Sequence, residues 1–258
     1  MHPAIPGSAP VRVALVTGAA RGLGLAIAQR LARDGLHCVL VDRLDEVVAA
    51  AAALGSPLGH AEGHVLDLTD GPALDAWLAG LAGRLGRVDV LVNNAGIHPK
   101  HPNGRYFLFK EISRADWRRV FAINLDAAFT LCQAVLPLMR AQGGGRIVNI
   151  ASRAGRMYSA SAGAHYAASK AALVAMTRSI AGEHGREGIT ANCVAPGATV
   201  SPMSRESGAT TGRYLDSVPV GRIGTAEELA ATVAFLAGPE AGYINGAIVD
   251  FNGGSFMP

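Results

Sequence analysis

The sequence predicts an α/β fold, in which a doubly wound, mostly parallel sheet of seven strands carries helices on both faces. Half of the 258 residues are apolar, which is enough to bury a large core. Short apolar runs alternate along the chain with longer stretches whose apolar residues recur at helical spacing. This alternation is typical of buried parallel strands that are joined by right-handed helical crossovers.

The individual elements follow from the apolar periodicity. Strands are expected at Val11–Val16, His37–Val41, Val65–Leu66, Val88–Val92, Ile147–Ile150, Ala191–Val194 and Ile248–Val249. Helices are expected at Leu25–Arg33, Asp45–Leu54, Asp75–Arg84, Arg114–Arg140, Gly163–His184 and Ala226–Ala237. No repeat or change of composition divides the chain. We therefore predict one domain over residues 11–258, preceded by a flexible tail at residues 1–10.

Two loops are longer than such a fold requires. They run from Ile97 to about Ile112 and from Gly197 to about Val220. Both leave the carboxyl end of a predicted strand, where open parallel sheets bind their ligands. We therefore expect these loops to form the walls of a substrate site.

The composition argues against several other classes of protein. The formal net charge is only +3 and the basic residues are scattered, so no nucleic-acid partner is expected. The cysteines Cys38, Cys132 and Cys193 lie far apart, without a CxxC pattern or a Cys/His cluster, which argues against disulfides and metal sites. Neither a run of 18 apolar residues nor a signal-peptide pattern occurs, so we expect a cytoplasmic protein without a membrane partner.

A glycine-rich segment follows the first predicted strand. It reads Thr17-Gly18-Ala19-Ala20-Arg21-Gly22-Leu23-Gly24, a TGxxxGxG pattern, and a predicted helix begins directly after it. Small residues let the backbone approach a pyrophosphate, which the free N–H groups and the positive dipole end of a helix N-terminus bind. Such a loop between a strand and a helix predicts dinucleotide binding by Gly18, Arg21, Gly22, Leu23 and Gly24.

Asp42 ends the second predicted strand, 18 residues after Gly24. At this position an acidic side chain can accept hydrogen bonds from the hydroxyls of an adenosine ribose; a turn or helix cap is the alternative role. The carboxylate would repel the 2′-phosphate of NADP, whereas Arg21 and Arg43 would attract it. Because Asp42 is expected to occupy the ribose position itself, we predict that NAD is preferred.

Asp67 and Leu68 follow the third predicted strand. Their position after a neighbouring strand predicts a contact with the adenine. A loop-capping role is the alternative for Asp67.

Tyr166 and Lys170 lie four residues apart in a predicted helix, so they share one helix face. A free tyrosine has a pKa near ~10, and proton exchange near neutrality requires that this pKa fall by about 2–3 units. A nearby ammonium and a positive nicotinamide ring have the right sign to lower it. The spacing is common by chance, so the pair indicates catalysis only together with other motifs.

Taken together, the motifs resemble those of the short-chain dehydrogenase/reductase family. The resemblance extends from Val11 to Gly254 and rests on motifs that occur in the family's order. They are TGAARGLG at 17–24, Asn93-Asn94-Ala95-Gly96, Asn124, Ser152, Tyr166-Ala167-Ala168-Ser169-Lys170 and Pro196-Gly197. The resemblance implies a Rossmann fold and an NAD(P)-dependent oxidoreductase, which moves a hydride between nicotinamide and a secondary alcohol or ketone.

The resemblance also implies roles for individual residues. Tyr166 would be the general acid/base beside Lys170, Ser152 would stabilise the substrate oxygen, and Asn124 would hold a water that links Lys170 to solvent. The adenosine end of the cofactor would be lined by Asn93, Asn94, Ala95 and Gly96. The nicotinamide end would be flanked by Pro196, Gly197 and Ser201.

Two features depart from the family's pattern. Ser152 precedes Tyr166 by 14 residues, about one more than is usual, which we interpret as an insertion in the intervening loop. Ser159 and Ser161 also carry hydroxyls, but they lie too close to the tyrosine helix to be good candidates. At position 201 the family more often has threonine, and Ser201 keeps the hydroxyl.

Other functions are open at this point. An epimerase- or dehydratase-like relative shares the tyrosine–lysine pair, but it usually has a TGxxGxxG loop and a larger C-terminal lobe. A dinucleotide sensor without catalysis would keep the fold and lose a catalytic residue, whereas all four predicted ones are present. A substrate-dependent change in NADH absorbance separates an enzyme from a sensor. Among enzymes, a 3-oxoacyl thioester reductase is the alternative.

The first long loop bears on the substrate. From His98 to Lys110 it contains no acidic residue, and Arg153 and Arg156 closely follow the predicted catalytic serine. A solvated loop with two structural arginines is the simpler interpretation. Alternatively, His98, Arg105 and Arg153 receive an oxygen-rich or anionic part of the substrate, because a guanidinium binds such groups through two hydrogen bonds. A polar secondary alcohol, such as a hydroxy acid or sugar derivative, is then expected.

The predicted helices at 114–140 and 163–184 carry apolar residues on more than one face. Such faces usually bury against a partner. Together with the resemblance, this pattern predicts a homotetramer.

Overall fold

The computed structural model describes residues 10–55, 60–200 and 215–258, so residues 1–9 of the predicted tail lie outside it. The described residues form one seven-stranded sheet in the order β3-β2-β1-β4-β5-β6-β7. All six neighbouring pairs are parallel. The strand order reverses between β1 and β4, which opens a crevice at the carboxyl ends of the strands. The predicted doubly wound fold is confirmed.

The strands are β1 (Val13–Thr17), β2 (His37–Asp42), β3 (Ala61–Val65), β4 (Val90–Asn93), β5 (Gly145–Ile150), β6 (Ile189–Pro196) and β7 (Ile248–Phe251). Every residue of β1, β4 and β6 is buried. Central strands of a parallel sheet read as continuous apolar runs because both of their faces are covered.

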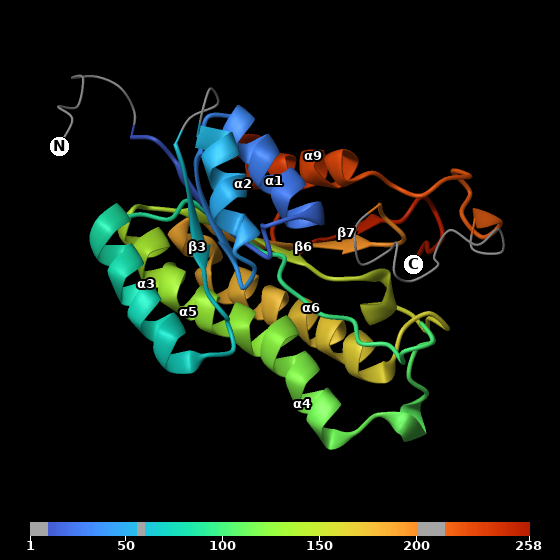
Figure 1. Cartoon of the computed structure of the whole chain (residues 1–258). Coiled ribbons are helices and arrows are strands. Elements are labelled where there is room, and N and C mark those ends of the chain that lie inside the picture. The colour runs from blue at the N-terminus through green and yellow to red at the C-terminus, as the bar shows by residue number, and fades with distance from the viewer. Residues whose placement is uncertain (1–9, 56–59, 201–214) are drawn as a thin grey trace.

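Helices cover both faces of the sheet (Figure 1). One face carries α1 (Gly22–Arg33), α2 (Glu46–Gly55) and α9 (Ala226–Ala237), and the other carries α3 (Gly71–Leu85), α5 (Ala127–Ala141) and α6 (Ala164–His184). Alternate residues of β1 point into the two cores: Ala14 and Val16 face α1, whereas Val13 and Leu15 face α3 and α5. Short 3-10 turns occur at Phe109–Glu111, Arg153–Gly155, Gly185–Glu187 and Pro239–Ala241.

The third strand differs from the prediction. We expected it at Val65–Leu66, but it spans Ala61–Val65 and is only partly buried. It lies at the sheet edge and pairs with β2 alone, so it needs no continuous apolar run. A Cβ on Gly63 would lie 2.5 Å from the carbonyl oxygen of Val47, which shows how closely α2 packs on this strand.

The long helix expected at Arg114–Arg140 is also different. It consists of α4 (Arg114–Phe121), a π-helical turn at Ala122–Asp126 and then α5. Asn124 lies buried within the π turn. Such turns frequently occur at functional sites, and apolar periodicity does not reveal them.

Within the described residues, one helical stretch, Arg114–Ala141, is long and apolar enough by length and composition to cross a membrane. In this structure α5 packs on the sheet through Leu131, Val135 and Met139, each at most 1% exposed. The stretch is therefore a layer of the domain.

A chain of buried polar side chains crosses the sheet below the crevice. Asn93 Nδ2 donates to Asn149 Oδ1 at 2.8 Å, and Asn149 Nδ2 donates to Thr177 Oγ1 at 2.8 Å. The Thr177 hydroxyl lies 3.1 Å from Cys193 Sγ. The chain ties β4, β5 and α6 together. The side chain of Asn93 therefore lies inside the domain and not at the adenosine end, where we expected it.

Candidate active site

The glycine loop joins β1 to α1. Gly18 and Gly22 have φ angles of 64° and 61°, which glycine adopts without strain. A Cβ on Gly24 would lie 2.1 Å from the carbonyl oxygen of Gly18 and 2.6 Å from Asn94 Nδ2. The loop therefore has no room for a side chain at position 24. Its backbone N–H groups lie at the N-terminus of α1, where a pyrophosphate can bind.

Thr17 and Asn94 lock this loop to the end of β4. Asn94 Nδ2 donates to the carbonyl oxygens of Thr17 and Gly18 at 2.9 and 3.0 Å. Thr17 Oγ1 accepts the backbone N–H groups of Asn94 and Ala95, both at 3.1 Å. Asn94 and Ala95 thus lie against the glycine loop. The anchoring role of Thr17 was missed because its partners are more than 70 residues away.

Asp42 is held against the same loop from β2. Its Oδ2 accepts the N–H of Ala20 at 3.0 Å, and its Oδ1 accepts the N–H of Leu44 at 3.2 Å. The structure therefore fixes the Asp42 carboxylate against the glycine loop, while Arg21 and Arg43, close to it in sequence or on that loop, are exposed to solvent.

Asp67 follows β3 and makes the contacts of a loop cap. Its Oδ1 accepts from the backbone N–H and the hydroxyl of Thr69 at 2.9 and 2.7 Å. These hydrogen bonds lower the pKa of the Asp67 carboxyl. Leu68 is partly buried and packs against the core on the α3 side of the sheet. These contacts fix the loop without themselves pointing to a ligand.

Asn124 connects the first long loop to the tyrosine helix. Its Oδ1 accepts the N–H of Ile97 at 2.8 Å, and its Nδ2 donates to the carbonyl of Ile97 at 3.1 Å. The same nitrogen donates to Ser169 Oγ at 3.0 Å, and that hydroxyl donates to the carbonyl of Tyr166 at 2.8 Å. One buried amide therefore sets the start of the loop relative to Tyr166.

Lys170 is buried at the end of β5. Its Nζ donates to the carbonyl of Ile150 at 2.7 Å. Burial lowers the pKa of Lys170 to about 8, so the ammonium form still predominates at neutral pH. A Cβ on Gly96 would lie 3.2 Å from Asn124 Oδ1 and 3.4 Å from Lys170 Nζ. Only a small residue at position 96 leaves both polar atoms undisturbed.

Ser152 caps the short turn that follows β5, and its Oγ accepts the N–H of Ala154 at 3.2 Å. Burial raises the pKa of Tyr166, while a hydrogen bond with Ser152 acts in the opposite direction. Lys170 Nζ lies 6.0 Å from the centroid of the tyrosine ring. The other three predicted catalytic residues, Asn124, Ser152 and Lys170, thus lie around Tyr166.

His98 covers that tyrosine. Its imidazole stacks on Tyr166 with ring centroids 3.9 Å apart and planes at 16°, and on Tyr106 at 4.6 Å and 27°. Burial, together with the positive charge of Lys100, lowers the pKa of His98 to about 3, so its ring is neutral. The sequence predicted that His98 contacts the substrate, but it did not predict a role for Tyr106. The contact between Tyr106 and His98 forms only when the loop folds back on itself.

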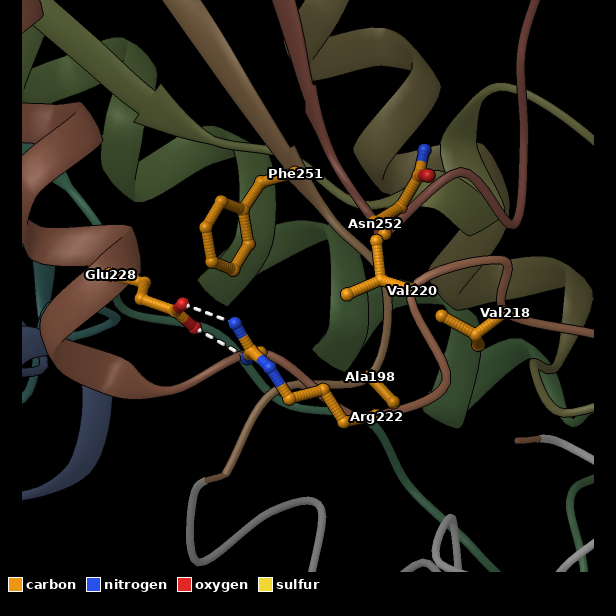
Figure 2. Close-up of a pocket in the computed structure, with 9 residues that line it drawn as sticks. Ala198, Val218, Val220, Arg222, Glu228, Phe251 and Asn252 are labelled. Carbon is orange, nitrogen blue, oxygen red and sulfur yellow. Dashed lines mark hydrogen bonds and ion pairs between the residues drawn. The ribbon is translucent and has the colours of Figure 1, made fainter.

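The nicotinamide end was predicted after β6. Pro196 ends that strand, and the N–H of Gly197 donates to the carbonyl of Phe251 at 2.8 Å. Ser201 lies outside the described residues. A pocket lies just beyond the ends of β6 and β7, and the ion pair of Arg222 with Glu228 borders it (Figure 2). Its lining includes Ala198, Val218, Val220, Phe251 and Asn252.

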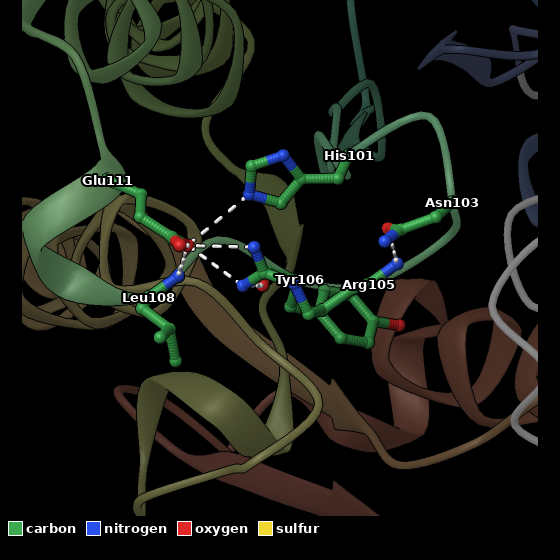
Figure 3. Close-up of polar contacts among 6 residues, drawn as sticks. All are labelled: His101, Asn103, Arg105, Tyr106, Leu108 and Glu111. Carbon is green, nitrogen blue, oxygen red and sulfur yellow. Dashed lines mark hydrogen bonds and ion pairs between the residues drawn. The ribbon is translucent and has the colours of Figure 1, made fainter.

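Arg105 does not point to a substrate. Its Nη1 and Nη2 donate to the two carboxylate oxygens of Glu111 at 2.8 and 3.0 Å (Figure 3). Glu111 also accepts the N–H of Leu108 at 2.8 Å and lies 3.3 Å from His101 Nε2. We predicted that Arg105 binds substrate, but in the structure it stabilises the shape of the loop. The reason is that Glu111, directly after the segment from His98 to Lys110 that has no acidic residue, supplies its partner.

Arg153, the other arginine predicted at the substrate, faces the C-terminal segment. Its Nη1 donates to the carbonyl of Ser255 at 3.4 Å. Chemically, the site combines a tyrosine hydroxyl, a serine hydroxyl and a buried ammonium at the edge where the glycine loop lies. This arrangement suits proton transfer at an oxygen whose carbon exchanges a hydride with a dinucleotide.

The glycine loop gives a direct test. We expect Gly24→Ala to weaken NADH binding more than tenfold, because the new methyl would displace the carbonyl of Gly18 and the amide of Asn94. Fluorescence titration with NADH measures this. Gly80→Ala in α3, where a Cβ would meet nothing within 4 Å, is the matched control. Equal affinity in the two variants would show that the loop does not hold the dinucleotide.

Comparison with known proteins agrees with this arrangement. A family model described as enoyl-(acyl carrier protein) reductase matches residues 18–255. The short-chain reductase protein NovJ of Streptomyces niveus is 41% identical over 252 residues, which cover 94% of this chain and 93% of NovJ. The 3-oxoacyl-[acyl-carrier-protein] reductase FabG of Escherichia coli (strain K12) is 38% identical over 248 residues, or 95% of this chain and 98% of FabG.

Solved structures are similar along the whole chain. A 3-oxoacyl-[acyl-carrier protein] reductase of Brucella melitensis with bound NAD has a TM-score of 0.86 and 35% identity, covering 96% of this chain and 92% of its own. A structure from Beutenbergia cavernae, described as an NAD(P)-dependent gluconate 5-dehydrogenase with NADP bound at low occupancy, has a TM-score of 0.85 and 38% identity. It covers 95% of this chain and 96% of its own. This chain belongs to the short-chain dehydrogenase/reductase family.

Proposed function

We propose that this protein, an NAD(P)-dependent oxidoreductase by family, prefers NAD and interconverts a polar secondary alcohol and its ketone. The single observation that carries the proposal is the tyrosine site itself: Tyr166 beside Ser152 and Lys170, at the sheet edge that also carries the glycine loop. The nicotinamide, when bound, supplies the hydride acceptor or donor.

The side chains divide the remaining work. Ser152 binds the substrate oxygen, and Tyr166 gives up or takes the proton of that oxygen. The ammonium of Lys170 favours the phenolate form, against the burial that raises the tyrosine pKa. Asn124 uses both amide hydrogens on Ile97 and Ser169, so only its oxygen can still accept a hydrogen bond from a relay water.

The cofactor site that we propose follows the crevice from β2 to β6. The glycine loop, which Asn94 locks in place, holds the pyrophosphate, and Asp42 holds the adenosine ribose. The remaining proposed contacts are Arg21, Leu23, Arg43, Asp67, Leu68, Ala95, Gly96, Pro196, Gly197 and Ser201. A Cβ on Gly18 or Gly24 would strike the end of β4 or the loop itself, so these glycines let the loop pack closely at the N-terminus of α1. The free N–H groups at that helix end support a dinucleotide here.

Tyr166→Phe tests the chemistry. Turnover is expected to fall by ~10²-fold or more, the order of magnitude that positioned proton transfer contributes. NADH affinity is expected to be unchanged, because the ring remains. Steady-state kinetics with NADH titration measures both quantities. Near-normal turnover of the variant would remove Tyr166 from its proposed role.

Asp42 tests the cofactor preference. A carboxylate 4 Å from a 2′-phosphate costs about 4 kcal/mol per pair of unit charges at an effective dielectric of 20, before screening. We expect kcat/KM to be at least tenfold higher with NAD than with NADP, and Asp42→Ala to narrow that ratio. One similar structure contains NAD and another contains NADP, so this ratio of kcat/KM values is needed to decide which cofactor this enzyme prefers. A tenfold preference of the unmodified enzyme for NADP would contradict the proposal.

The substrate proposal rests on the wall over Tyr166. This wall consists of the neutral imidazole of His98 and the Tyr106 ring, with Lys100 Nζ 5.5 Å from the centroid of that ring. Such a polar surface favours a hydroxy acid or sugar derivative over a long apolar chain. A 3-oxoacyl thioester is the second candidate, because relatives at 38% identity carry that activity in their names.

The two candidates are separated by kcat/KM for gluconate and for acetoacetyl-CoA. We expect gluconate or a related hydroxy acid to be the better substrate, and His98→Leu to raise its KM at least tenfold. Lys110→Ala, an exposed change on the same loop, is the control. Faster turnover of the thioester, unaffected by His98→Leu, would favour the second candidate.

We further propose that the enzyme is a cytoplasmic homotetramer. Trp117 on α4 and Phe129 on α5 are 38% and 48% exposed, and burial against another copy would remove this apolar surface from water. Cys38, Cys132 and Cys193 are buried free thiols, which suits a reducing compartment. Sedimentation equilibrium is expected to give about four times the monomer mass of 26.5 kDa. A monomer at micromolar concentration would contradict the assembly.

A further inference from the structure

The chain beyond β7 folds into a compact turn around Asn252. Its Nδ2 donates to the carbonyl of Phe256 at 3.0 Å, and its Oδ1 accepts the N–H groups of Gly254 and Phe256 at 2.9 and 3.4 Å. Asn252 is buried. We call residues 250–256 the C-terminal turn. It starts at Asp250, the β7 residue that pairs in register with Ala195 of β6.

The C-terminal turn holds the two arginines that follow Ser152. Arg156 Nη1 forms an ion pair with Asp250 Oδ2, and both side chains are only 17% exposed. The Arg156 guanidinium lies 5.2 Å from the centroid of the Phe256 ring. Arg153 donates to the carbonyl of Ser255. These contacts give Arg156 a partly buried partner on one side and an aromatic face on the other.

The segment fixed in this way is the 3-10 turn that begins at Ser152. The N–H of Gly155 donates to the carbonyl of Ser152 at 3.0 Å, and the N–H of Arg156 donates to that of Arg153 at 3.0 Å. A Cβ on Gly155 would lie 2.8 Å from the backbone nitrogen of Ala171, so the turn presses directly on α6. It is therefore held between α6 and the C-terminal turn.

The ion pair of Arg156 with Asp250 also balances positive charge. Arg156 on the turn, and Lys170 and Arg178 on α6, all lie close enough to Cys193 to oppose the burial that raises the pKa of its thiol. Asp250 pairs with Arg156, one of these cations, through its Oδ2, and its Oδ1 has no hydrogen-bond partner among the described residues. Without Asp250, Arg156 would lose its counter-charge and be repelled by its neighbours.

We propose that Arg156, held by Asp250 and Phe256, is a positioning residue that fixes the Ser152 hydroxyl against Tyr166. The C-terminal turn is thereby part of the active site, although it contributes no catalytic group. This inference rests on the proposed function, because it assigns Arg156 a role through Ser152. Arg156 does not serve as a substrate anchor, since its guanidinium is already paired with Asp250.

The test compares Arg156→Met, Arg156→Lys and Asp250→Asn with Arg30→Met, which removes an exposed ion pair on α1. For Arg156→Met and Asp250→Asn we expect at least a tenfold fall in kcat at an unchanged NAD affinity. In the pH profile of kcat/KM for alcohol oxidation, the fall in activity on the acidic side is expected to move to higher pH. The reason is that the hydrogen bond with Ser152 holds the tyrosine pKa down. Arg156→Lys is expected to recover part of the activity.

A double-mutant cycle with Ser152→Ala separates positioning from general destabilisation. The double variant is expected to be no slower than Ser152→Ala alone, and its pH profile is expected to be the same. Independent, multiplicative losses would overturn the inference, as would an Arg156→Met enzyme with normal kcat and pH profile. Full activity of Ser152→Ala would instead contradict the proposed function and, with it, the inference. If Arg156→Met does not fold, Phe256→Leu and Arg156→Lys provide the same comparison.

Discussion

The side-chain amide of Asn124 is the contact on which the site depends most. It joins Ile97, at the start of the first long loop, to Ser169 on α6, and Ser169 holds the backbone of Tyr166. The π turn is the local distortion that carries this buried amide between α4 and α5. Because Asn124 and Ser169 are buried, replacing either side chain would leave hydrogen-bonding partners unsatisfied, and such losses are costly inside a protein.

Burial also sets the chemistry of the tyrosine site. It raises the pKa of Tyr166 and lowers that of Lys170 to about 8, so both shifts favour the neutral forms. A proton can leave Tyr166 near neutrality only if specific groups oppose this trend. A hydrogen bond with Ser152 opposes it. The ammonium of Lys170, whose Nζ lies 6.0 Å from the centroid of the tyrosine ring, has the right sign of charge to do the same.

The walls around the tyrosine are held by ion pairs within the chain. Glu111 gathers Arg105, His101 and the N–H of Leu108, and so gives the first loop a defined shape. Asp250 performs a comparable role for Arg156 behind Ser152. In both cases a basic residue near the tyrosine is neutralised by a carboxylate from the same chain, whereas the imidazole of His98 stacks directly on Tyr166.

The sequence by itself determined the α/β fold, the single sheet, the family and the three residues, Asn124, Ser152 and Lys170, that lie around Tyr166. These features leave local signals: apolar strands that must be buried on both faces, glycines that a Cβ would obstruct, and a tyrosine and a lysine on one helix face. The tertiary structure alone decided the extent of the edge strand β3, the π turn at Asn124 and the stacking of Tyr106 on His98. It also decided the ion pairs of Arg105 with Glu111 and of Arg156 with Asp250. An edge strand needs no apolar run, and a pair such as Arg156 with Asp250 joins residues 94 positions apart, so only the folded chain brings such groups into contact.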